Sequence, residues 1–216
     1  MTSVLKFPRG LYGITPAWSD FKKLVRATEQ AAEGGMAALQ WRQKSITALQ
    51  AIDQAGQLRE VCRRLGVVFI VNDSIDLALA VDADGVHLGR EDGDPGSARD
   101  RIGAGKLLGA SCYNELSRAQ QALSAGADYI AFGAVYPSSV KPNAVKAGLE
   151  LFQEVRALSG TLNDAQPGVI AIGGITPENA APLLQAGATG IAVISGLFEV
   201  ADIRAQAQRY SGLFEA

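Results

Sequence analysis

Two aspartates stand where two consecutive buried strands are expected to end. Asp73 follows the apolar, β-branched run Val67 to Val71, and Asp92 follows the next apolar run, Gly85 to Leu88. Apolar runs separated by helices indicate a parallel sheet covered on both faces, in which residues beyond the carboxyl ends of strands line the functional edge. The two carboxylates therefore predict a metal site. The alternative is that Asp73 only caps the following helix and that Asp92 and Asp94 are solvated loop acids.

A basic cluster follows the second expected strand. Gln40 and Arg42 are two residues apart, so they lie on the same side of an extended chain, and Lys44 continues that side. Arginine and lysine together favour a phosphate or diphosphate ligand, although an ordinary solvated loop is the alternative. Lys141, in the long loop after the sixth expected strand, is a further candidate for diphosphate binding.

Small residues follow the last two expected strands, in Ile172-Gly173-Gly174-Ile175 and in Val193-Ile194-Ser195-Gly196. Loops at these positions in barrels often bind phosphate through backbone N–H groups, and glycine permits the close approach. The alternative is that the two glycines merely make the turn.

No nucleophilic arrangement is evident. His87, the single histidine, lies inside the fourth expected strand, where we interpret it as structural because no Ser-His-Asp or Cys-His set forms around it. Cys62 and Cys112 have the spacing of neither a disulfide framework nor a zinc site. The candidate functional residues are therefore acidic and basic side chains, with no evident nucleophile.

The elements that must position these residues alternate between strand and helix about every two dozen residues, giving about eight units. The expected strands are 11–15, 36–41, 67–71, 85–88, 107–111, 129–135, 169–172 and 191–194. The expected helices are 19–33, 48–65, 75–81, 115–125, 149–158 and 180–186. A faint repeat of small residues precedes four strands, at 34–37, 82–85, 125–128 and 186–189, and favours tight turns there.

The fold class predicted from this pattern is α/β, a single-domain (β/α)8 TIM barrel spanning residues 1–216. A doubly wound open sheet is disfavoured because no Gly-x-Gly-x-x-Gly turn follows the first strand. The composition, 48% hydrophobic with 24 glycines, suits a large core with many turns. With 20 basic and 22 acidic residues and no basic run, a nucleic-acid partner is not expected. No signal-like or membrane-spanning apolar run is present, so we expect a cytoplasmic protein with no membrane partner.

Taken in order, the motifs resemble the thiamine-phosphate synthase family over nearly the whole chain. They are Gln40-x-Arg42-x-Lys44, Asn72-Asp73, Gly85-Val86-His87-Leu88-Gly89-x-Glu91-Asp92, Gly109-x-Ser111, Pro137-Ser138-x-x-Lys141 and Ala171-Ile172-Gly173-Gly174-Ile175. The resemblance implies a transferase that joins 4-amino-2-methyl-5-hydroxymethylpyrimidine diphosphate to 4-methyl-5-(2-phosphooxyethyl)thiazole, releasing pyrophosphate. In the dissociative chemistry of that family, the C–O bond breaks first and the thiazole nitrogen captures the pyrimidinylmethyl cation.

The same resemblance implies Mg²⁺ as the cofactor, with Asp73 and Asp92 as metal ligands. It implies catalytic roles for Lys141, Arg42 and Ser111. The implied substrate-binding residues are Gln40, Arg42, Lys44, Asn72, Ser111, Ser138, Lys141, Gly174, Ile194 and Ser195. The expected partners are small phosphorylated substrates, and a homo-oligomer is compatible with the sequence.

The chain departs from the family in the loop after the sixth strand, where the usual pattern is Gly-Pro-x-x-Pro-Thr-x-Thr-Lys. Ala134 replaces the first proline, Ser138 the first threonine and Val140 the second, so we expect one hydroxyl donor to the thiazole phosphate to be lost. Two alternatives stay open. A thiazole tautomerase-like isomerase is opposed by the retained aspartates and lysines, and a non-catalytic phosphate-binding barrel would be excluded by activity with both substrates.

Overall fold

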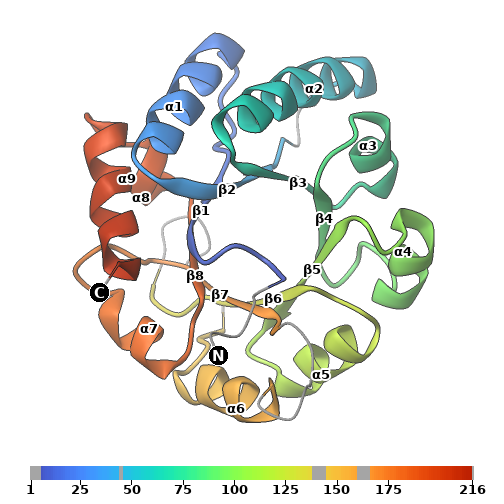
Figure 1. Ribbon diagram of the computed structural model, residues 1–216, viewed down its shortest axis with the longest axis vertical. Helices are drawn as coiled ribbons and strands as arrows, with labels where there is room; N and C mark the ends of the chain where they lie inside the picture. Colours follow the sequence, from blue (N-terminus) through green and yellow to red (C-terminus); the bar gives the residue numbers. More distant parts are fainter. Residues whose placement is uncertain (1–5, 44–45, 138–144, 160–165, 216) are drawn as a thin grey trace.

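The structure is a computed structural model that describes residues 6–43, 46–137, 145–159 and 166–215. Eight parallel strands close into a barrel in the order β1 to β8 (Figure 1). The strands are β1 Gly10–Ile14, β2 Met36–Trp41, β3 Val68–Asn72, β4 Gly85–Leu88, β5 Leu107–Tyr113, β6 Tyr129–Phe132, β7 Gly168–Ile172 and β8 Gly190–Val193. The predicted (β/α)8 barrel is confirmed.

Helices surround the barrel (Figure 1). They are α1 Phe21–Glu33, α2 Ala48–Leu65, α3 Ile75–Ala80, α4 Pro95–Ile102, α5 Leu116–Ser124, α6 Glu150–Ser159, α7 Ala181–Ala186, α8 Ser195–Phe198 and α9 Ile203–Ser211, followed by a 3₁₀ turn, Gly212–Phe214. The sequence did not predict α4, α8 or α9. Helix α4 buries only Ala98 and Ile102, so it lacks a wide apolar stripe, and its start is fixed instead by Asp94, whose carboxylate accepts from the Ser97 amide at 2.8 Å.

The strands are buried on both faces by two hydrophobic clusters. The larger cluster lies between the barrel and its helices, and the smaller one fills the barrel interior with Phe7, Tyr12, Ile14, Ala38, Ile70, Tyr129, Ala131, Ile170 and Ala192. Phe7 precedes β1, in the segment that crosses the inside of the strand ring in Figure 1, and its ring stacks on Tyr129 at 4.1 Å between centroids. This segment therefore closes the amino-terminal end of the barrel and leaves the carboxyl ends of the strands as the mouth.

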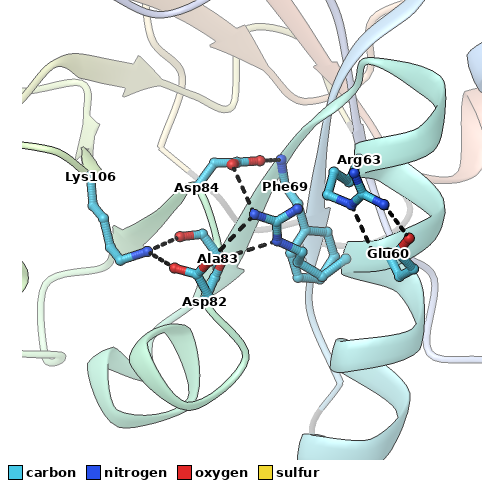
Figure 2. Close-up of polar contacts among 8 residues, drawn as sticks. Glu60, Arg63, Phe69, Asp82, Ala83, Asp84 and Lys106 are labelled. Atoms are coloured by element: carbon cyan, nitrogen blue, oxygen red, sulfur yellow. Dashed lines mark hydrogen bonds and ion pairs between the residues drawn. The ribbon is translucent and has the colours of Figure 1, made fainter.

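Three strands are fastened to the preceding strand by the residue just before them. The side chains of Asp84, Asp128 and Thr189 accept hydrogen bonds from the amides of Phe69, Leu108 and Val169 at 2.7, 2.8 and 2.8 Å. Figure 2 shows the Asp84 carboxylate at the Phe69 amide, with Lys106 on the neighbouring Asp82. The faint sequence repeat predicted tight turns at these positions, and the structure shows that three of its four segments also supply a side-chain hydrogen-bond acceptor.

Asp128 is the acceptor whose loss should cost most. Its carboxylate also accepts from Arg99 Nη2 at 2.5 Å, and the Leu108 residue that it bonds is fully buried. Asp128→Ala removes the acceptor of the Leu108 amide and one partner of Arg99, whose Nη2 still donates to the Gly126 carbonyl, so we expect the free energy of unfolding to fall by about 2 kcal/mol in urea titrations. Asp128→Asn keeps an acceptor oxygen and should lose less. A loss no larger than that of the exposed Asp100→Ala variant would contradict this account.

Candidate active site

The carboxyl ends of β3 and β4 bring the first group of predicted residues together. Asn72 is the last residue of β3 and pairs in register with His87 of β4, and the amide of Asp73 donates to the His87 carbonyl at 2.9 Å. Asp73 has a φ of 65°, a left-handed conformation that side-chain-bearing residues rarely adopt. Such strain costs about 1–3 kcal/mol and concentrates at functional sites.

Asp73 is not the cap of the helix that follows it. The N-cap of α3 is Ser74, whose hydroxyl accepts from the Leu77 amide at 3.1 Å. The alternative interpretation of Asp73 as a simple helix cap is therefore wrong.

Asp92 lies in a loop that is held over the end of β4. Its Oδ2 accepts from the Gly89 amide at 2.7 Å, and a Cβ on Gly89 would lie only 2.7 Å from that same oxygen. The loop is fastened to β5 and α5, because the Arg90 amide donates to the Tyr113 hydroxyl and Arg118 donates to the carbonyls of Gly89 and Ser111. The carboxylate is thus positioned before any ligand arrives.

The protein supplies few metal-binding groups at this mouth. Within the described ranges, no cluster of three or more His, Cys, Asp or Glu side chains is placed to hold a metal ion. Two carboxylates from neighbouring strand ends fit Mg²⁺, which commonly takes one or two carboxylates together with substrate phosphate oxygens and water. They do not fit zinc, whose sites use nitrogen and sulfur ligands in fuller sets.

Arg42 begins the loop after β2. Buried Thr15 holds its backbone, because the Thr15 hydroxyl accepts from the Arg42 amide at 2.8 Å and donates to the Arg42 carbonyl at 3.2 Å. No ion pair joins its guanidinium to a carboxylate of the part of the chain that the structure describes. The half-buried arginine is therefore available to an anionic ligand.

A chain of hydrogen bonds crosses the barrel interior between two predicted site residues. Gln40 Nε2 donates to the Tyr12 hydroxyl at 2.8 Å, and that hydroxyl lies 2.9 Å from the Tyr129 hydroxyl. Tyr129 lies 3.1 Å from His87 Nδ1, and His87 Nε2 lies 2.9 Å from Ser111 Oγ. Burial lowers the pKa of His87 to about 4 and raises the pKa of both tyrosines, so these three groups are neutral at pH 7.

Sequence reasoning missed Tyr12, Tyr129 and the contact of His87 with Ser111. The available signal was the placement of polar-tipped residues within apolar strands, at the positions that face the barrel axis. The two cysteines are free and buried, and burial raises the pKa of both thiols to about 12, so neither is a thiolate nucleophile.

The loops after β7 and β8 form the other side of the mouth. Gly174 has a φ of +63°, and a Cβ there would lie 2.3 Å from the Pro137 carbonyl oxygen, so the neighbouring loop itself requires glycine. Asn179 braces this turn by donating to the Gly174 carbonyl at 3.0 Å and accepting from the Thr176 amide at 2.8 Å.

Ile194 and Ser195 stand where β8 passes into α8, which begins at Ser195. Helix α9 supports both loops, because Gln206 donates to the Gly196 carbonyl and Tyr210 to the Ile175 carbonyl. Lys44, Ser138 and Lys141, which the sequence also predicts at the site, lie outside the described residues, as does Val140.

None of the described helices is long and apolar enough to span a bilayer.

Comparison with known proteins agrees with this architecture. Residues 11–197 match the family model described as thiamine monophosphate synthase. The chain is 53% identical to thiamine-phosphate synthase of Bordetella pertussis over 97% of each chain, and 48% identical to that of Methylobacillus flagellatus over 95% of each. Thiamine phosphate pyrophosphorylase from Pyrococcus furiosus has a solved structure with a TM-score of 0.81 and 35% identity, covering 97% of this chain and 96% of that one.

Proposed function

This chain belongs to the thiamine monophosphate synthase family and is an enzyme of thiamine biosynthesis, and from that premise we propose the reaction and roles that follow. The substrates are 4-amino-2-methyl-5-hydroxymethylpyrimidine diphosphate and 4-methyl-5-(2-phosphooxyethyl)thiazole, and the products are thiamine phosphate and pyrophosphate. The observation that carries the proposal is the mouth itself, where Arg42, Asp73 and Asp92 follow neighbouring strands across from two small-residue loops. Such a mouth suits one diphosphate and one phosphate.

The leaving diphosphate is the group whose developing negative charge most needs to be stabilised. In a dissociative step, the C–O bond breaks while negative charge builds on the departing oxygen, so fixed positive charge stabilises the transition state. Arg42, with Lys44 and Lys141 from the sequence motifs, would neutralise that charge. Asp73 and Asp92 would hold Mg²⁺, which when bound would supply further positive charge to the diphosphate.

The remaining residues orient the two organic groups. Gln40, Asn72 and Ser111 would contact the pyrimidine diphosphate, and Gly174, Ile194 and Ser195 would hold the thiazole phosphate, with Ser138 from the sequence motif. No nucleophile or strong base is required, because the thiazole nitrogen captures the cation. This agrees with a mouth where both cysteines are buried and the single histidine is neutral.

The direct test mixes the purified protein with both phosphorylated substrates and Mg²⁺ and measures thiamine phosphate and pyrophosphate together. The reaction requires equal amounts of the two products, and neither should form when one substrate is omitted. Isomerisation of a thiazole carboxylate precursor without pyrophosphate release would support the tautomerase alternative. Binding of both substrates without turnover would support the non-catalytic barrel. We further propose a cytoplasmic location, with small phosphorylated substrates and Mg²⁺ as the ligands.

Asn179→Asp tests the phosphate side of the mouth. The variant keeps the acceptor for the Thr176 amide and loses the donor to the Gly174 carbonyl. We expect the KM for the thiazole phosphate to rise about tenfold, the worth of roughly one hydrogen bond, with the KM for the pyrimidine diphosphate little changed. Gln208→Glu on the exposed face of α9 controls for an added negative charge. An equal rise in both KM values would place the thiazole phosphate elsewhere.

A further inference from the structure

The hydrogen-bonded chain Gln40–Tyr12–Tyr129–His87–Ser111 has a direction that its chemistry fixes. The amide nitrogen of Gln40 can only donate, so the Tyr12 oxygen accepts from it. The hydrogen of the buried Tyr12 hydroxyl then needs an acceptor, and within the described residues the Tyr129 oxygen is the partner in reach. Tyr12 therefore donates to Tyr129, because the reverse order would leave a buried hydroxyl hydrogen unpaired.

The same reasoning continues through the histidine. The Tyr129 oxygen accepts from Tyr12, so its own hydrogen goes to His87 Nδ1. Because Nδ1 accepts this hydrogen, it carries none of its own, so the N–H of the imidazole is on Nε2. His87 Nε2 donates to Ser111 Oγ, which leaves the Ser111 hydroxyl hydrogen pointing to a further acceptor.

Packing holds the middle of the chain in place. The Tyr129 ring occupies the space where a side chain on Gly109 would stand, since a Cβ there would lie 2.0 Å from Cζ of Tyr129. The rings of Phe7 and His87 both stack on the Tyr129 ring, with centroids 4.1 and 5.4 Å from its centroid. Arg118 holds the Ser111 carbonyl at 2.8 Å, so the strand that carries the hydroxyl is also fixed. Ser111 is half-buried near the carboxyl end of β5, where a ligand in the mouth can reach it.

We propose that Tyr12, Tyr129 and His87 are positioning residues that fix His87 as the Nε2–H tautomer and thereby make Ser111 a hydrogen-bond donor to the pyrimidine diphosphate. This rests on the proposed function for the identity of the acceptor. The substrate atom that Ser111 meets must then be an acceptor, a ring nitrogen or a diphosphate oxygen.

The tautomer is directly measurable because His87 is the only histidine in the chain. In the ¹⁵N-histidine-labelled protein without substrate, long-range ¹H–¹⁵N correlation should show a protonated Nε2 and a bare Nδ1 near neutral pH. Tyr129→Phe removes the donor to Nδ1 and should give a mixture of tautomers, while Phe7→Leu, which removes only stacking, should keep the wild-type pattern. A protonated Nδ1 in the wild-type protein would overturn the proposal, whether or not the proposed reaction is observed.

A double-mutant cycle tests whether the chain acts through Ser111. Tyr129→Phe is expected to lower kcat about tenfold in the wild-type background and to have almost no effect in the Ser111→Ala background. Equal losses in both backgrounds would show a general packing defect and overturn the positioning role. If Tyr129→Phe does not fold, the wild-type spectrum and the same cycle with His87→Gln decide the question. A wild-type protein inactive on both substrates but showing the Nε2–H tautomer would contradict the proposed function and leave the tautomer assignment standing.

Discussion

Asp92→Asn is expected to lower kcat by about a hundredfold, because it removes one of the two charged oxygen ligands proposed for Mg²⁺ at the leaving diphosphate. The asparagine retains an oxygen that can accept from the Gly89 amide, so the loop bond at 2.7 Å is preserved while the charge is lost. Asp73→Asn should act similarly, since asparagine tolerates the left-handed backbone that this position needs.

The measurement is steady-state turnover with both substrates varied and Mg²⁺ titrated. Weaker metal binding should appear as a higher Mg²⁺ concentration for half-maximal rate, and chelation by EDTA should abolish wild-type activity reversibly. Asp94→Asn is the matched control, because Asp94 lies two residues further on and caps α4, a role that asparagine fills equally well. Near wild-type rates for both Asp73→Asn and Asp92→Asn would show that these residues do not bind the metal.

The barrel was predictable because its strands are short apolar runs that alternate with helical segments. The limits of β2, α2 and β4 agree with those expected from the sequence, since glycine, threonine or a charged residue bounds each of them. The strand expected at 129–135 is too long, because β6 ends at Phe132 and the following apolar residues belong to the loop. Helices α4, α8 and α9 were not predicted because their periodic signal is weak: α4 and α9 begin at aspartate caps and bury two and three side chains, and α8 has only four residues.

The sequence indicates the charged residues of the candidate site and buried Gln40, but not Tyr12, to which Gln40 donates. Asp73, Asp92 and Arg42 follow strand ends, and their charges stand out against apolar runs. Tyr12 and Tyr129 look like ordinary core residues in a sequence, because a buried tyrosine hydroxyl reveals its partner only when distant strands close into a barrel. The requirement for glycine at position 174 arises in the same way, from a carbonyl on a different loop.

Arg42→Met is expected to lower kcat about a hundredfold, with a smaller rise in the KM for the pyrimidine diphosphate. The reason is that charge on the diphosphate is greatest as the C–O bond breaks, so a guanidinium there stabilises the transition state more than the bound substrate. Thr15 holds both backbone groups of Arg42, so the loop should keep its course when the side chain changes.

Arg42→Lys separates charge from geometry. Lysine keeps the positive charge but lacks the planar fork that binds two phosphate oxygens at once, so we expect it to recover about a tenth of wild-type kcat. Arg64→Met, which changes an exposed arginine of α2 that pairs with Glu29, controls for the loss of one positive charge and should leave turnover unchanged. If Arg42→Met raises KM and leaves kcat intact, the guanidinium contributes equally to substrate and transition state, and neutralisation of the leaving group must then fall to Lys44 and Lys141.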